Sequence, residues 1–217
     1  MPSDRSPTLV LASRSPRRRW LLTEAGLGDG LIVADPPHDD PATPDPRPGQ
    51  DVAGFVAETA RRKAESVVGL GSFRDAVIVA ADTVCVGATG TLLGKPADRD
   101  ELLRMLRGFV GATHDVVSGV AVFCVDGRGE TTHREAWADA AAVTWGPLAE
   151  AELFAYADTD GWHGKAGGYN LAERVAAGWP ISMQGDPATV MGLPVVRLLP
   201  RLADLGVTQP QLPGAPR

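Results

Sequence analysis

The sequence has little cysteine and no long apolar run. Its only cysteines, Cys85 and Cys124, lie in separate apolar stretches, without a second Cys or a His at the spacing of a metal site. Each is therefore expected to be a reduced core residue, which is typical of a cytosolic protein. No uncharged stretch approaches the ~20 residues that cross a bilayer, and no export signal is recognised. A cytoplasmic protein without membrane insertion is predicted.

An excess of positive charge is also lacking. Lys and Arg number 21 against 27 Asp and Glu, so the formal net charge is -6. Without a global positive field, or aromatic residues interleaved with basic ones, a nucleic-acid-binding module is disfavoured. Apolar residues make up 44% and charged residues 22%, which excludes disordered and fibrous classes. Any site for an anion must therefore be built from a few local cations.

A zinc motif is missing as well. No HExxH pattern and no paired ligand spacing is formed by the four histidines, which are His38, His114, His133 and His163. His114 precedes a predicted strand, and its position fits contact with a ligand and a structural hydrogen bond equally well. Asp39 and Asp40 offer oxygen ligands for a divalent cation, although neighbouring acids in a loop also fit simple solvation.

What the sequence does contain is a series of β-rich apolar runs and amphipathic helices. Strands are predicted at residues 8–13, 31–34, 76–81, 84–86, 91–93, 116–125 and 130–145, and helices at 16–25, 51–68, 98–106, 148–157 and 194–205. Residues 35–50 and 158–168 are predicted loops, and 209–217 a frayed tail. In the first helix Trp20, Leu21 and Leu22 are expected to face the core. These elements predict a mixed α/β sheet protein.

The first candidate site is the turn from Ser13 to Arg18, where a strand meets a helix that begins with Ser15 as N-cap and Pro16 at its first position. Free backbone N–H groups, serine hydroxyls and guanidinium groups there suit phosphate oxygens. Arg17, Arg18 and the following arginine stand at the helix end that disfavours cations, so an anion is expected nearby. A capped helix with solvated arginines fits the same pattern.

Asp82 is the second candidate, because it follows a buried apolar run at the sheet edge where α/β proteins place ligands. It is suited to holding Mg²⁺ or activating water, although a turn aspartate bonded to its neighbours fits as well. The chain has three lysines only, Lys63, Lys95 and Lys165, and otherwise uses arginine. Lys95 lies between a glycine and a proline, in a rigid turn that can direct its charge toward a phosphate, although each lysine alone also fits a solvated surface.

Taken in order, these segments resemble the Maf family of nucleoside triphosphate pyrophosphatases, and the match spans about residues 9–205. The specificity of the resemblance comes from the order of the motifs. They are Leu11-Ala12-Ser13-Arg14-Ser15-Pro16-Arg17-Arg18, Lys63-Ala64, Ala81-Asp82-Thr83-Val84, Gly94-Lys95-Pro96, Thr113-His114-Asp115-Val116, Lys165-Ala166-Gly167-Gly168-Tyr169 and Val190-Met191-Gly192-Leu193-Pro194.

The resemblance implies one Maf-like domain over residues 1–217, with an elongated mixed sheet, flanking helices and two lobes around a central cleft. It also implies hydrolysis of a nucleoside triphosphate to the monophosphate and diphosphate with Mg²⁺ or Mn²⁺, and a homodimer. Asp82 would accept the proton, and Asp40 and Asp82 would hold the metal. The residues expected to contact the substrate are Ser13, Arg17, Arg18, Lys63, Thr83, Lys95 and Lys165. Positioned cations and a metal would offset charge on the leaving diphosphate.

Two departures leave the base open. Family members that act on dTTP and UTP show Gly-Ile-Gln-Gly where this chain has Asn170-Leu171-Ala172-Glu173. A second branch, which acts on 7-methylguanosine triphosphate, is similar around residues 185–190 but differs around Asp82 and His114. The family is also associated with arrest of septum formation, so a nucleotide-binding regulator without turnover is the alternative function. A water-activating carboxylate at Asp82 favours the enzyme.

Overall fold

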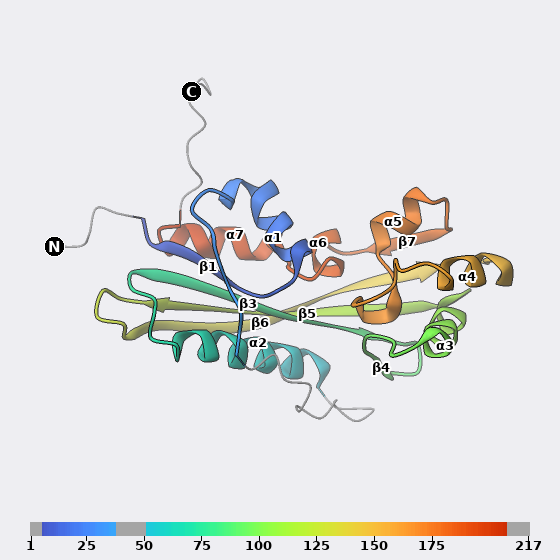
Figure 1. The fold of residues 1–217 in the computed structure, drawn as a ribbon, viewed down its shortest axis with the longest axis horizontal. Coiled ribbons are helices and arrows are strands. Elements are labelled where there is room, and N and C mark those ends of the chain that lie inside the picture. Colours follow the sequence, from blue (N-terminus) through green and yellow to red (C-terminus); the bar gives the residue numbers. More distant parts are fainter. Residues whose placement is uncertain (1–5, 38–50, 208–217) are drawn as a thin grey trace, which may run out of the picture.

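The computed structural model describes residues 6–37 and 51–207, and in them seven strands form one sheet (Figure 1). The strands are β1 (Thr8–Ala12), β2 (Ile32–Ala34), β3 (Ala76–Val86), β4 (Leu92–Leu93), β5 (Thr113–Val125), β6 (Thr131–Trp145) and β7 (Ile181–Gln184). Their order is β2-β1-β3-β5-β6-β7, with β4 paired to β3 off this path. β1 is parallel to β2 and β3, and the other pairs are antiparallel. The predicted mixed sheet is confirmed.

Helices cover both faces of the sheet. In Figure 1, α1 (Pro16–Leu22), α6 (Pro187–Val190) and α7 (Val195–Asp204) lie on one face, and α2 (Val52–Val68) lies on the other. A third group, α3 (Arg99–Phe109), α4 (Glu150–Ala157) and α5 (Leu171–Ala176), gathers at one end of the long strands. Short π- and 3-10-helical turns occupy Thr23–Leu27 and Ala166–Gly168. In the described ranges no helix is long and apolar enough to cross a bilayer.

The alternation of side chains along the strands divides the core between these layers. Leu9 and Leu11 of β1 pack in the cluster with α1 and α7, whereas Val10 and Ala12 pack in the cluster with α2. A third cluster, built around Phe109 and Trp145, lies with α3 and α4. This cluster forms the second lobe that the family resemblance implies.

The predicted helix starts at 51 and 98 are confirmed, because the Asp51 and Asp98 side chains accept hydrogen bonds from Gly54 and Glu101 N–H groups. The expectation that Trp20 faces the core is wrong, since 51% of its surface is exposed. Three consecutive helical residues span roughly 200° of the helix circumference, wider than the stripe that a surface helix buries. Leu21 and Leu22 take the buried side, and Trp20 is left outside.

Three elements near the C-terminal end are absent from the sequence prediction, namely α5, β7 and α6. Each has six residues or fewer, so hydrophobic periodicity has little length in which to appear. The segment 38–50 of the predicted proline-rich loop, with Asp39 and Asp40, and the predicted tail 209–217 lie outside the described residues.

Candidate active site

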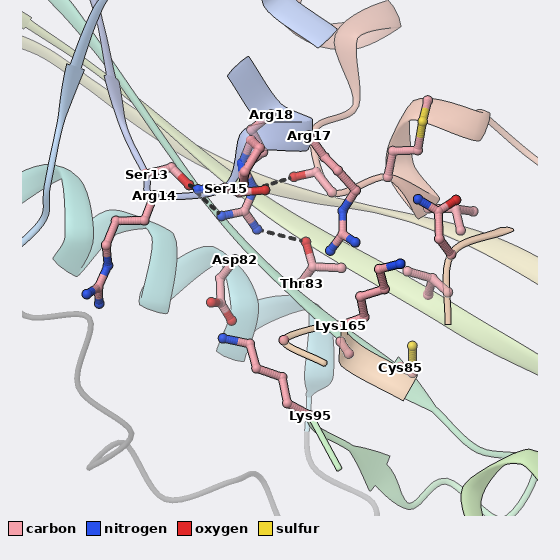
Figure 2. A pocket seen from close by; sticks show the side chains of 18 of the residues that line it. Ser13, Arg14, Ser15, Arg17, Arg18, Asp82, Thr83, Cys85, Lys95 and Lys165 are labelled. Carbon is pink, nitrogen blue, oxygen red and sulfur yellow. Dashed lines mark hydrogen bonds between the residues drawn. The ribbon is translucent and has the colours of Figure 1, made fainter. Parts of the chain in front are cut away.

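A pocket of about 600 Å³ lies where the β1–α1 turn, α2, β3 and the segment before α5 meet (Figure 2). Its size falls in the range of small-molecule sites. The pocket brings together side chains that are far apart in the sequence, including Asp82 and all of the residues predicted to contact substrate: Ser13, Arg17, Arg18, Lys63, Thr83, Lys95 and Lys165. Residues that are far apart in the sequence therefore line one cavity.

The pocket exists because two neighbouring strands differ in length. β1 ends at Ala12, opposite Ala80, while β3 continues to Val86. The edge of β3 next to Asp82 therefore has no β1 partner and opens to the pocket. The predicted strand end before Asp82 is wrong, because antiparallel pairing with β5 keeps β3 extended through Val86. The alternative interpretation of Asp82 as a turn residue is wrong for the same reason.

Asp82 points to the α2 face of the sheet, where Lys63 reaches it. The Lys63 Nζ atom lies 2.8 Å from Asp82 Oδ1. The two side chains are 12% and 20% exposed, so the pair is shielded from bulk water yet remains open to the pocket. A charge-assisted hydrogen bond in such a place fixes the orientation of the carboxylate.

On the opposite face, Arg18 joins the β1–α1 turn to β3 and to the turn before α7. Its guanidinium donates to Gly192 O at 2.8 Å, Ser13 Oγ at 3.0 Å and Thr83 Oγ1 at 3.1 Å (Figure 2). Ser15 occupies the predicted N-cap position, but its side chain makes no capping hydrogen bond. Its backbone N–H donates instead to Ser13 Oγ at 3.2 Å.

The other predicted cations extend into the pocket from different elements. Figure 2 shows Arg17 on α1 and Lys165 before α5 on one side, and Lys95 near Asp82. Lys165 donates to Glu173 Oε2 at 2.8 Å and is 16% exposed, so one of the pocket's positive charges already has a carboxylate partner.

Glu173 and Asn170 are pocket residues that the sequence interpretation did not include. Their spacing in the sequence could have predicted the short helix that positions them, because an Asn followed three residues later by Glu is typical of a helix N-terminus. Asn170 Oδ1 accepts from the Glu173 N–H at 3.2 Å, which starts α5 and directs Glu173 toward Lys165.

Uncharged side chains form the inner wall. Tyr169 lines the pocket, and its hydroxyl lies 2.8 Å from Nε2 of His114, which stacks on Phe109 at a centroid distance of 4.0 Å. Burial lowers the pKa of His114 to about 4 and raises the pKa of Cys85 to about 12, so both are neutral near pH 7. His114 stands behind Tyr169 rather than in the pocket lining, which favours the structural interpretation.

The metal prediction rests on two carboxylates, of which one is described. Asp40 lies outside residues 6–37 and 51–207, and inside those ranges no three His, Cys, Asp or Glu side chains cluster as a cation site. Asp82 lines the pocket beside the cations. A divalent ion there would need oxygen ligands from a bound molecule or water besides Asp82.

Comparison with known proteins places the whole described fold in one family. The family described as Maf-like protein matches residues 8–205. A dTTP/UTP pyrophosphatase of Anaeromyxobacter sp. (strain Fw109-5) is 34% identical over 209 residues, covering 96% of this chain and 95% of that protein. The dTTP/UTP pyrophosphatase of Pelotomaculum thermopropionicum is 37% identical over 199 residues, covering 91% and 96%, and that of Deinococcus radiodurans is 35% identical over 208 residues, covering 96% and 98%.

Proposed function

The chain belongs to the family of Maf-like proteins and is a nucleoside triphosphate pyrophosphatase, and we propose that it cleaves dTTP and UTP in the pocket around Asp82. The products are the nucleoside monophosphate and diphosphate. The observation that carries this proposal is the Lys63–Asp82 pair, which places an oriented carboxylate inside a cavity lined by cations. Triphosphates need such a combination, because charge builds on the leaving diphosphate while water attacks.

In the proposed mechanism Asp82 orients the attacking water and accepts its proton. Lys63 holds Oδ1 of the carboxylate at 2.8 Å and leaves the second oxygen for this role. Phosphate oxygens are bound by Ser13 from the β1–α1 turn, Arg17 from α1 and Lys95 from the turn after β4. Their positive charge offsets the charge of the leaving diphosphate, which lowers the barrier.

A divalent cation completes the proposal, with Asp82 as the described residue that would hold it. Mg²⁺ is commonly bound by one or two carboxylates together with substrate phosphates and water, and a single pocket carboxylate among phosphate-binding cations fits this pattern. When bound, such an ion would offset the negative charge that builds on the leaving diphosphate. The predicted contribution of Asp40 stays a prediction.

The preference for thymine and uracil is supported by the relatives, which are named for dTTP and UTP. The pocket lining also includes Asn170 and the Lys165–Glu173 pair. These side chains offer both donors and acceptors, as the Watson–Crick edge of a base requires.

A cytoplasmic location and a homodimer are further parts of the proposal. The two cysteines, Cys85 and Cys124, are free thiols, which a reducing compartment maintains. The homodimer rests on the family resemblance and stays a prediction.

A substrate panel tests the proposed base preference. Purified protein is expected to release diphosphate from dTTP and UTP with kcat/KM at least about tenfold above that for dGTP, ATP and 7-methylguanosine triphosphate. Tenfold corresponds to about 1.4 kcal/mol, the net contribution of roughly one hydrogen bond. Diphosphate, nucleoside monophosphate and free phosphate are measured together, because release of free phosphate would reveal cleavage at the γ-phosphate instead. A preference for 7-methylguanosine triphosphate would assign the chain to the second branch, and nucleotide binding without release of diphosphate would support the regulator instead.

Removal of divalent cations tests the proposed metal. Chelation with EDTA is expected to lower turnover of the preferred substrate by about 100-fold or more, because a metal is worth several kcal/mol of charge stabilisation. Added Mg²⁺ or Mn²⁺ should restore it. EDTA already saturated with Mg²⁺ is the matched control, and full activity in free EDTA would exclude a metal requirement.

A further inference from the structure

Four polar groups from four elements form one hydrogen-bond chain beneath the phosphate-binding turn. It begins at Arg18 on α1, passes to Thr83 on β3 at 3.1 Å, continues to Ser118 on β5 at 2.9 Å and ends on the carbonyl oxygen of Thr189 on α6 at 2.8 Å. Thr83 and Ser118 are register partners in the sheet. Ser118 is completely buried and lies outside the pocket lining.

The chemistry at the two ends determines the direction of every bond in the chain. A guanidinium only donates, so Arg18 donates to Thr83 Oγ1, and a carbonyl only accepts, so Ser118 donates its single hydroxyl proton to Thr189 O. Ser118 then has no proton for Thr83. The bond between the two hydroxyls therefore runs from Thr83 to Ser118.

This direction assigns different roles to the two hydroxyls that contact Arg18. Thr83 uses its single hydroxyl proton in the hydrogen bond to Ser118, so it cannot also donate to a phosphate oxygen while the chain is intact. Ser13 is the reverse case, because its oxygen accepts from Arg18 at 3.0 Å and from the Ser15 N–H at 3.2 Å. Both of its lone pairs are used, and its proton remains as the group available to a phosphate.

We propose that Ser118 is a positioning residue of the pyrophosphatase reaction, acting through Thr83 and Arg18 without contacting substrate. This inference rests on the function proposed above. Because Ser118 accepts the hydrogen bond from the Thr83 hydroxyl, the Thr83 oxygen keeps a lone pair directed at Arg18. Arg18 in turn donates to the Ser13 oxygen and leaves the Ser13 proton free to be donated to a phosphate. The same chain sets the position of β3 at Asp82 relative to the start of α1.

Ser118→Ala tests this role, because alanine removes the acceptor of the Thr83 proton without adding volume. The Thr83 hydroxyl is then free to rotate, and the guanidinium loses its fixed acceptor. We expect kcat to fall on the order of 10- to 100-fold, as for a small misplacement of reacting groups, while KM changes less than about threefold because the cations remain. Both constants are measured for the preferred triphosphate well below the midpoint of thermal unfolding of each variant.

Thr144→Val is the matched control. Thr144 on β6 shares a 2.8 Å hydroxyl contact with Thr113 on β5, at an exposed position away from the pocket. Loss of this pair should leave kcat and KM unchanged.

A double-mutant cycle with Thr83→Val decides whether Ser118 acts through Thr83. If it does, adding Ser118→Ala to Thr83→Val should lower kcat less than about threefold further. Multiplied effects of the two substitutions, or full activity of Ser118→Ala, would overturn the positioning role. An inactive unmodified protein would instead reject the proposed function, so the two failures are distinguishable. Should Ser118→Ala not fold, full activity of Thr83→Val alone would overturn the proposal.

Discussion

Replacing Asp82 with asparagine is expected to lower kcat for diphosphate release by about 10³-fold. The amide has nearly the same shape and can still accept from Lys63 at the Oδ1 position, so the pocket keeps its geometry. It cannot accept the proton of the attacking water, and a positioned general base contributes roughly 10²- to 10⁴-fold. The measurement is kcat at saturating substrate and metal, together with the midpoint of thermal unfolding.

Asp115→Asn is the control for this prediction. Asp115 lies on β5, opposite Val86 at the end of β3, and is exposed outside the pocket. Its substitution should leave kcat unchanged. Asp82→Glu keeps the carboxylate but moves it by one methylene, and is expected to fall between the unmodified protein and Asp82→Asn. Should Asp82→Asn retain more than a tenth of the original kcat, Asp82 is not the base and the mechanism is wrong.

The sequence identifies the chemistry of the pocket better than its geometry. Every residue predicted to contact substrate lines the same cavity, because the motif order carried information that no single motif has. The position of Asp82 within a continuous strand was not predictable, since its extension depends on pairing with β5 rather than on local composition. The pairing of Asp82 with Lys63 likewise depends on how closely α2 approaches the sheet.

Polar partners were the least predictable part. In the sequence Arg18 is one of several arginines at a helix start, yet its guanidinium donates to Ser13 in the adjoining turn and to two oxygens from distant segments, on Thr83 and Gly192. Glu173 belongs to a helix too short for a periodic signal. The Thr83 and Gly192 partners of Arg18 are brought to it by tertiary structure alone, whereas Glu173 reaches Lys165 from only eight residues away.

The close approach of α2 leads to the second large effect, Gly119→Ala. Gly119 on β5 lies opposite Asp82 and faces α2. A Cβ atom there would lie 2.2 Å from Val56 O and 2.5 Å from Ala57 N, and these backbone atoms cannot rotate away as a side chain can. The helix must move off the sheet, and we expect the free energy of unfolding to fall by about 3 kcal/mol, the upper part of the usual range for overpacking.

The displaced helix is also expected to lower catalysis. Val56 and Lys63 are seven residues apart on α2, about two turns, so they share the face that meets the sheet. A shift at Val56 therefore carries Lys63 away from Asp82, now at 2.8 Å, and kcat/KM should fall on the order of 10- to 100-fold even at temperatures where the variant is folded. Calorimetry and steady-state kinetics on the same preparation measure the two effects.

Gly108→Ala is the matched control, because a Cβ at Gly108 in α3 meets no atom within 4 Å. Alanine there should leave kinetics unchanged and stabilise the protein by up to about 1 kcal/mol, through its better helix propensity. If Gly119→Ala loses stability but keeps its full kcat/KM, the Lys63–Asp82 contact does not contribute to catalysis and Asp82 acts without it. If it loses neither, the sheet and α2 accommodate a Cβ atom, and the close approach is not what brings Lys63 to the carboxylate.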